Sequence, residues 1–136
     1  MKTVYFIPNY WYHSIELFQE ISISLGNNIK KVFLDTGDPI YQSSRGTQYK
    51  LDDLNNYYDA IFSLEYPQKQ DIKIIQLLRM YQYKIKLNKI MSVNKPNLII
   101  TTGDRNNFYL ILKRICPGIP IVIMQGALFH THYYQI

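Results

Sequence analysis

The segment Asn97-Leu98-Ile99-Ile100-Thr101-Thr102-Gly103-Asp104 is a continuous apolar run that ends in small polar residues and a glycine. Apolar residues at successive positions, rather than at alternate ones, are typical of a strand that a parallel sheet buries on both faces. Lys95-Pro96 comes just before it and ends any preceding helix, because the residue before a proline disfavours the α conformation. We therefore expect this strand to lie inside a sheet that helices cover on both sides.

Strands and helices alternate along the rest of the chain. Short β-branched and aromatic runs bounded by turn residues predict four further strands, over residues 2–8, 30–35, 59–64 and 120–124. Apolar residues at helical spacing predict helices over about 15–25, 70–93 and 108–115, and a short helix is expected over 51–57. This alternation predicts an α/β, Rossmann-like, three-layer α/β/α fold with a mostly parallel five-stranded sheet in the order 3-2-1-4-5.

The longest predicted helix, over about 70–93, carries an apolar stripe formed by Ile74, Leu77, Leu78, Tyr81 and Ile85. We expect this stripe to be the face that the fold buries. Four basic residues fall off the stripe and are interpreted as a solvated face rather than as a binding patch: Lys73, Arg79, Lys84 and Lys86.

Length and composition bound the class of protein. The chain has 136 residues, of which 47% are hydrophobic and 18% charged, and this fits one globular domain with a core of its own. The single cysteine, Cys116, excludes an internal disulfide framework and indicates a reducing compartment, so we expect a cytoplasmic location. Cys116 is interpreted as a packed thiol rather than as a nucleophile. No apolar run is long enough for a secretion signal or a membrane span.

The formal net charge of +5 is compatible with three kinds of anionic partner: nucleic acid, a membrane surface or a phosphorylated substrate. The basic residues are scattered, and no aromatic RNA-binding motif accompanies them, so we expect no nucleic-acid partner. A peripheral contact with the anionic inner face of a membrane stays open. His130 and His132 have no third ligand in pattern, so no metal site is expected, and no motif indicates a cofactor.

Ligands of open parallel α/β sheets bind at the carboxyl ends of the strands, where the strand order reverses. For the order 3-2-1-4-5, this rule brings together the segments that follow the first, fourth and fifth strands. The candidate site residues in these segments are His13 as catalytic base and, for substrate binding, Asn9, Trp11, Gly103, Asp104, Arg105, Gln125 and Gly126. Topology thus predicts where a ligand lies without identifying the ligand.

The residue types in these segments indicate what they can do. An imidazole titrates near neutral pH, so His13 can act as a general base, and its alternative role is to pack against or cap the first helix. The aromatic side chains around Trp11 can form a platform for a sugar ring or a base. Gly103 allows close approach of the main chain to a ligand, while Asp104 can orient that ligand or cap the next helix. Gln125 can both donate and accept hydrogen bonds.

Two common nucleotide-binding patterns are absent after the first strand. The segment 8–14 contains neither the glycine pattern of dinucleotide-binding folds nor the glycine-rich loop of phosphate-binding NTPases. We therefore expect neither a redox dinucleotide enzyme nor a P-loop NTPase.

Residues 95–104 and 118–128 resemble two segments of the N-terminal domain of GT-B-fold enzymes. In those enzymes a Lys-Pro-Asp pattern precedes a hydrophobic strand and Gly-Asp, and a later Ile-Pro strand ends in Gln or Glu followed by Gly. The group includes many bacterial polysaccharide glycosyltransferases and the UDP-N-acetylglucosamine 2-epimerases. The epimerases carry a glutamate where this chain has Gln125 and an arginine where it has Phe129, whereas Asp104 matches their aspartate.

The segment after the first strand is similar to glycosyltransferases in which a histidine deprotonates the acceptor hydroxyl. His13 matches that histidine by spacing, although Tyr12 stands where a glycine is common. The resemblance implies the acceptor-binding domain of a glycosyltransferase of surface polysaccharide biosynthesis, in which Asp104 and Gln125 orient a sugar or lipid-linked acceptor.

In the GT-B fold a second domain binds the nucleotide sugar, and 136 residues leave no room for it. We therefore expect residues 1–136 to be a single Rossmann-like domain, the N-terminal half of a larger two-domain enzyme, and inactive alone. An epimerase-like domain and a non-catalytic α/β binding or regulatory module are the alternatives.

Overall fold

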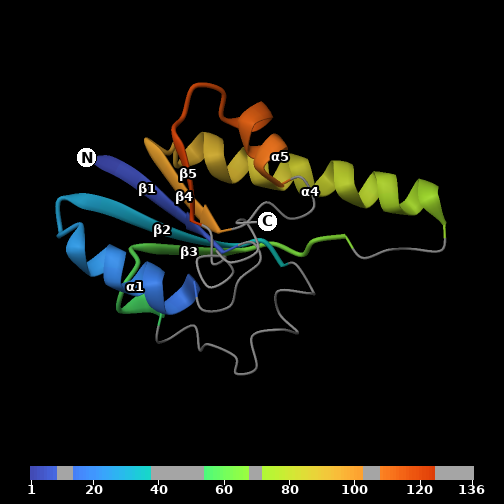
Figure 1. Cartoon of the computed structure of the whole chain (residues 1–136). Coiled ribbons are helices and arrows are strands. Elements are labelled where there is room, and N and C mark those ends of the chain that lie inside the picture. The colour runs from blue at the N-terminus through green and yellow to red at the C-terminus, as the bar shows by residue number, and fades with distance from the viewer. Residues whose placement is uncertain (9–13, 38–53, 68–71, 103–107, 125–136) are drawn as a thin grey trace, which may run out of the picture.

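The structure is a computed structural model, and it describes residues 1–8, 14–37, 54–67, 72–102 and 108–124. Within these residues, five strands form one sheet: β1 (Lys2–Ile7), β2 (Ile29–Asp35), β3 (Ala60–Ser63), β4 (Leu98–Thr102) and β5 (Ile121–Met124). The described helices are α1 (Ser14–Ser24), α4 (Lys73–Val93) and α5 (Phe108–Ile115). The strand order is β3-β2-β1-β4-β5 and every neighbouring pair is parallel, which confirms the predicted fold class and strand order (Figure 1).

Two side chains set the pairing of the strands at the edge of the sheet where the strands begin. The main-chain N–H of Asn97 donates to the carbonyl of Thr3, and the N–H of Thr3 donates back to Asn97 Oδ1, each over 2.8 Å. Asp59 and Lys31 form the same reciprocal pair, with both bonds again 2.8 Å long. Asn97 and Asp59 each come just before a strand, so their side chains extend the parallel ladders by one residue.

One face of the sheet is covered by α1 and by the segment that precedes β3. Phe18 of α1 meets Phe6 of β1 edge to face with ring centroids 5.4 Å apart, and Tyr58 lies against the same Phe6 ring at 5.4 Å. Leu54 is fully buried in this layer and begins a helical turn, because the N–H groups of Tyr57 and Tyr58 both donate to its carbonyl. That turn is the described part of the short helix expected over 51–57.

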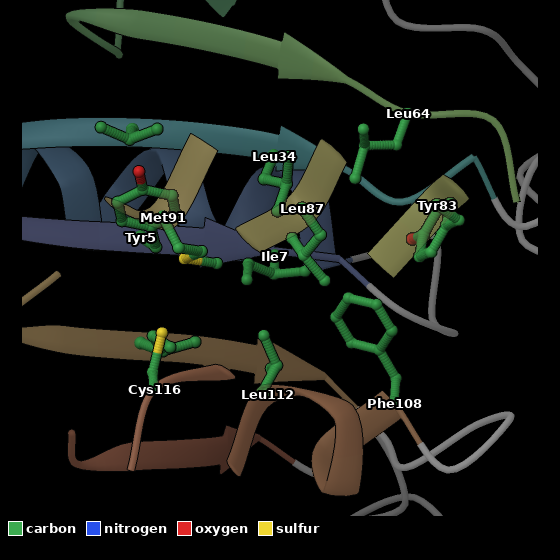
Figure 2. Packing of buried hydrophobic residues seen from close by; sticks show 12 residues of the cluster. Tyr5, Ile7, Leu34, Leu64, Tyr83, Leu87, Met91, Phe108, Leu112 and Cys116 are labelled. Atoms are coloured by element: carbon green, nitrogen blue, oxygen red, sulfur yellow. The ribbon is translucent and has the colours of Figure 1, made fainter. Parts of the chain in front are cut away.

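The opposite face is covered by α4 and α5. Figure 2 shows their buried side chains meeting those of the central strands, with Leu87 and Met91 from α4 and Leu112 from α5 around Tyr5 and Ile7. Helices therefore cover both faces of the sheet, which explains why the central strands are apolar at successive positions. The predicted three-layer arrangement is confirmed.

The sequence interpretation of the longest helix was wrong about its buried face. The buried residues of α4 are Tyr83, Leu87 and Met91, whereas the predicted stripe is exposed to solvent: Ile74, Leu77, Leu78, Tyr81 and Ile85. The contacts of Tyr83 with Thr36 and of Asn94 with Tyr5 turn a different side of α4 toward the sheet, and the helix is also longer than the sheet. The 21 residues of α4 span about 31 Å at 1.5 Å per residue, more than any strand beneath it. The first part of α4 therefore extends past the sheet, as Figure 1 shows.

Candidate functional site

The strand order reverses between β1 and β4, and these two strands lie side by side with Ile7 paired to Thr101. The chain leaves β1 toward α1 on one face of the sheet, and it leaves β4 toward α5 on the other. Connections that diverge in this way open a crevice at the carboxyl ends of the two strands, which is where ligands of such sheets bind. We call the row of strand ends at this side the carboxyl edge.

A side chain-to-main chain bond joins the two central strands at the carboxyl edge. Thr101 Oγ1 donates a 2.8 Å hydrogen bond to the carbonyl oxygen of Ile7. Ile7, Thr101 and Thr102 are all buried. The ends of β1 and β4 are therefore held at a fixed separation, and this fixes the two points from which the following segments begin.

The end of β2 forms a second rigid part of the carboxyl edge. Asp35 Oδ1 accepts a 2.8 Å hydrogen bond from the N–H of Gly37, and the hydroxyl of Tyr83 donates to the carbonyl of Thr36 over 3.0 Å. Gly37 has φ +73°, and a Cβ atom at this position would lie 2.0 Å from the carbonyl oxygen of Leu64. Only glycine fits this approach of two chain segments, so the turn after β2 is firmly shaped.

Two polar groups near this turn were not among the sequence-predicted site residues. Asp35 is a buried carboxyl-bearing residue at the end of β2, and β2 neighbours β1. Thr36 is fully buried, and its hydroxyl has no hydrogen-bond partner among the described residues. The sequence did hold a signal for Asp35, since a carboxylate that ends a strand of a parallel sheet faces the ligand-binding edge. Nothing local in the sequence distinguishes Thr36.

All eight candidate site residues lie outside the described residues. These are Asn9, Trp11, His13, Gly103, Asp104, Arg105, Gln125 and Gly126. The structure does describe the strand ends that lead to them, because Ile7 pairs with Thr101 and Thr102 pairs with Met124. The ends of β1, β4 and β5 are therefore direct neighbours in the order that the sequence predicted, and the roles of the eight side chains stay predictions.

A buried tyrosine joins the sheet to the end of α4, far from the carboxyl edge. The hydroxyl of Tyr5 donates to the carbonyl of Asn94 over 2.7 Å and lies 3.4 Å from the carbonyl of Ile90. Both carbonyls belong to the C-terminal end of α4, where the carbonyl of Ile90 also accepts the main-chain N–H of Asn94 and the carbonyl of the C-cap residue Asn94 lies past the last turn. Burial, and secondarily the charge of a Cys116 thiolate, raise the pKa of Tyr5 well above its usual value near 10. Tyr5 is therefore a neutral donor with a structural role.

Cys116 follows α5, is buried and is not part of a disulfide. Burial raises the pKa of its thiol, and the positive charge of Lys95 opposes the shift without cancelling it. A thiol that keeps its proton is a poor nucleophile. The burial of Cys116 in the core confirms its interpretation as a packed thiol.

In the part of the chain that the structure describes, no three His, Cys, Asp or Glu side chains gather as a metal site would require. None of the described helices combines the length and the apolar character that crossing a membrane demands.

Comparisons with known proteins support the fold alone. No protein-family profile and no curated protein matches the sequence. The chain is similar to two crystal structures of the C-terminal domain of the PF1911 hydrogenase from Pyrococcus furiosus. The first has a TM-score of 0.52 at 13% identity and aligns over 90% of this chain and 91% of that chain. The second has a TM-score of 0.52 at 12% identity and aligns over 90% of each. At this identity the likeness shows a shared α/β arrangement.

Proposed function

We propose that this chain is the acceptor-binding domain of a glycosyltransferase that works on surface polysaccharide in the cytoplasm. One structural observation carries the proposal. The bond from Thr101 to Ile7 holds the ends of β1 and β4 together at the reversal of strand order. The segment that contains His13 leaves the first of these ends, and Gly103-Asp104 leaves the second. The resemblance of residues 95–104 and 118–128 to GT-B enzymes supports the same assignment.

In the proposed reaction, His13 takes the proton of an acceptor hydroxyl as that oxygen attacks the anomeric carbon of a nucleotide sugar. The new bond joins the acceptor oxygen to the anomeric carbon, and the bond from that carbon to the nucleoside diphosphate breaks. The nucleoside diphosphate leaves with the electron pair. This role of His13 applies to a transfer that inverts the anomeric configuration. Asp104 and Gln125 orient the acceptor, and a second α/β domain holds the nucleotide sugar.

The test is sugar transfer by the complete gene product, followed as release of nucleoside diphosphate with a panel of nucleotide sugars and acceptors. His13→Ala is expected to lower kcat by roughly 10²–10⁴, the usual contribution of a general base. His132→Ala serves as the matched control, since it removes a histidine with no assigned role, and it is expected to leave kcat unchanged.

Two results would count against the proposal. Unchanged turnover in the His13→Ala variant removes the histidine from the mechanism. Absence of transfer with every donor and acceptor, in a folded protein, favours the non-catalytic binding module instead.

A further inference from the structure

The outer face of α4 carries a row of large apolar side chains that the domain leaves in water. Their exposed fractions are 68% for Ile74, 70% for Leu77, 57% for Leu78, 65% for Tyr81 and 49% for Ile85. We call these five residues the outer stripe. Single exposed leucines are ordinary, but a contiguous apolar patch on a helix marks a surface that another body covers.

The geometry of the helix makes the outer stripe continuous. Its members follow one another at spacings of three, one, three and four residues, which places them on one side of a helix that turns about 100° per residue. The residues that face the sheet, Tyr83, Leu87 and Met91, are centred about 130° away around the helix. A helix that carries two separate apolar faces is characteristic of one that is covered on both. The described residues of the domain cover only one.

The position of α4 relative to the sheet explains why the described strands and helices leave the stripe uncovered. Tyr83 reaches the carboxyl edge, where its hydroxyl bonds to Thr36, and Asn94 reaches the other end of the sheet, where it bonds to Tyr5. Residues 83–94 therefore span the sheet, and residues 73–82 project about 15 Å past the carboxyl edge. Most of the outer stripe lies on this projecting part (Figure 1).

The charge of α4 indicates what kind of partner surface can cover the outer stripe. The helix contains no acidic residue and five basic ones: Lys73, Arg79, Lys84, Lys86 and Lys89. At 100° per residue, Lys84 falls on one flank of the stripe and Lys89 on the other. Long basic side chains beside an apolar face are typical of helices that lie in the surface of an anionic bilayer, with their apolar side among the lipid chains.

We propose that the outer stripe of α4 docks this domain onto an anionic lipid bilayer. A second copy of the chain fits less well, because two α4 helices packed on their outer stripes bring the flanking Lys84 and Lys89 of each helix together with no acidic partner from either helix. The docking is independent of the proposed function.

The experiment is flotation of the complete protein with two kinds of vesicle. One is pure phosphatidylcholine, and the other contains about one third phosphatidylglycerol. We expect binding to the anionic vesicles that falls steeply when the salt is raised to about 0.5 M, and much weaker binding to the neutral ones.

Variants distinguish binding through the outer stripe from non-specific adsorption to the vesicles. Leu77→Ser combined with Leu78→Ser is expected to lower the vesicle partition coefficient about tenfold or more. Leu110→Ser is the matched control, because Leu110 is an exposed leucine on α5, and it is expected to leave vesicle binding unchanged.

Lys84→Gln combined with Lys89→Gln is expected to lower binding about fivefold for each charge removed at low salt. The same charge loss at Lys2 and Lys113 is its control. All of these positions are at least partly exposed, and circular dichroism verifies the fold of each variant.

Three results would overturn the proposal. The first is absence of binding to anionic vesicles. The second is binding that the double leucine variant leaves intact. The third is a parent protein that sediments as a dimer and does not bind vesicles, together with a double leucine variant that sediments as a monomer. That result would assign the outer stripe to contact with a second copy of the chain. The proposed glycosyl transfer is tested separately, because its assay with a water-soluble acceptor is expected to give the same kcat for the double leucine variant.

Discussion

Thr101 and Ile7 are 94 positions apart in the chain, and the threonine hydroxyl bonds to the isoleucine carbonyl over 2.8 Å. The two residues are register partners on the adjacent strands β1 and β4. Because the strand order reverses between these strands, the bond lies directly beneath the position where a ligand of such a sheet sits. The same bond therefore serves the stability of the sheet and the shape of the candidate site.

Thr101→Val is expected to lower the free energy of unfolding by about 1–2 kcal/mol, because the buried carbonyl of Ile7 loses the hydroxyl donor of Thr101. Thr36→Val is the matched control. Thr36 is just as buried, but its hydroxyl has no partner among the described residues, so the change is expected to be neutral or stabilising. Urea unfolding followed by circular dichroism measures both. Equal losses in the two variants would mean that the bond to Ile7 is not a stabilising contact.

Gly37→Ala is expected to destabilise the domain by about 3 kcal/mol or more, because the new Cβ collides with the Leu64 carbonyl and the residue already has a positive φ. Gly118→Ala separates the two causes. Gly118 has φ +83° but open space around the position of a Cβ, so only the conformational cost of about 1 kcal/mol applies. Thermal unfolding of the two variants gives the comparison. A Gly37→Ala variant no less stable than Gly118→Ala would contradict the close approach.

Tyr5→Phe is expected to lower the free energy of unfolding at neutral pH by about 1–2 kcal/mol, because the carbonyl of Asn94 loses its donor. Tyr81→Phe is the control, since Tyr81 is mostly exposed and the change is expected to have no measurable effect on stability. Denaturant unfolding of both variants and of the parent measures the difference.

The pH dependence of the same pair of proteins tests the burial of Tyr5. Burial raises its pKa above the value near 10 that a tyrosine has in the unfolded chain, so between these values the folded state holds the extra proton. The stabilisation from Tyr5 is therefore complete below about pH 10 and declines as the pH rises further. The parent protein should lose up to about 1.4 kcal/mol per pH unit more than Tyr5→Phe in this range. Parallel curves for the two proteins above pH 10 would show that the folded Tyr5 ionises normally.

Much of the fold was predictable because its signals are local. Pro8 and Pro96 bound strands, Gly26 and Gly118 follow helices at positive φ, and the apolar run from Leu98 to Thr102 forms the expected buried strand. The order of these elements restricts the topology further, because crossovers between parallel strands are right-handed and must carry a helix. The location of the candidate site follows from that topology, although the side chains proposed to act there lie outside the described residues.

The sequence alone was sufficient for the elements, their order and the edge of the sheet where a ligand is expected, because periodicity, proline and glycine act over a few residues. Only the tertiary structure decided which apolar stripe of α4 meets the sheet. Both stripes have helical spacing, and the choice between them depends on where Tyr83 meets Thr36 and where Asn94 meets Tyr5, contacts between residues 47 and 89 positions apart. The bond from Thr101 to Ile7 and the fit of Gly37 against Leu64 are of the same kind, since each depends on two segments that the sheet brings together. Long-range packing, which leaves no mark on the local pattern, is thus what exposes the outer stripe and shapes the carboxyl edge.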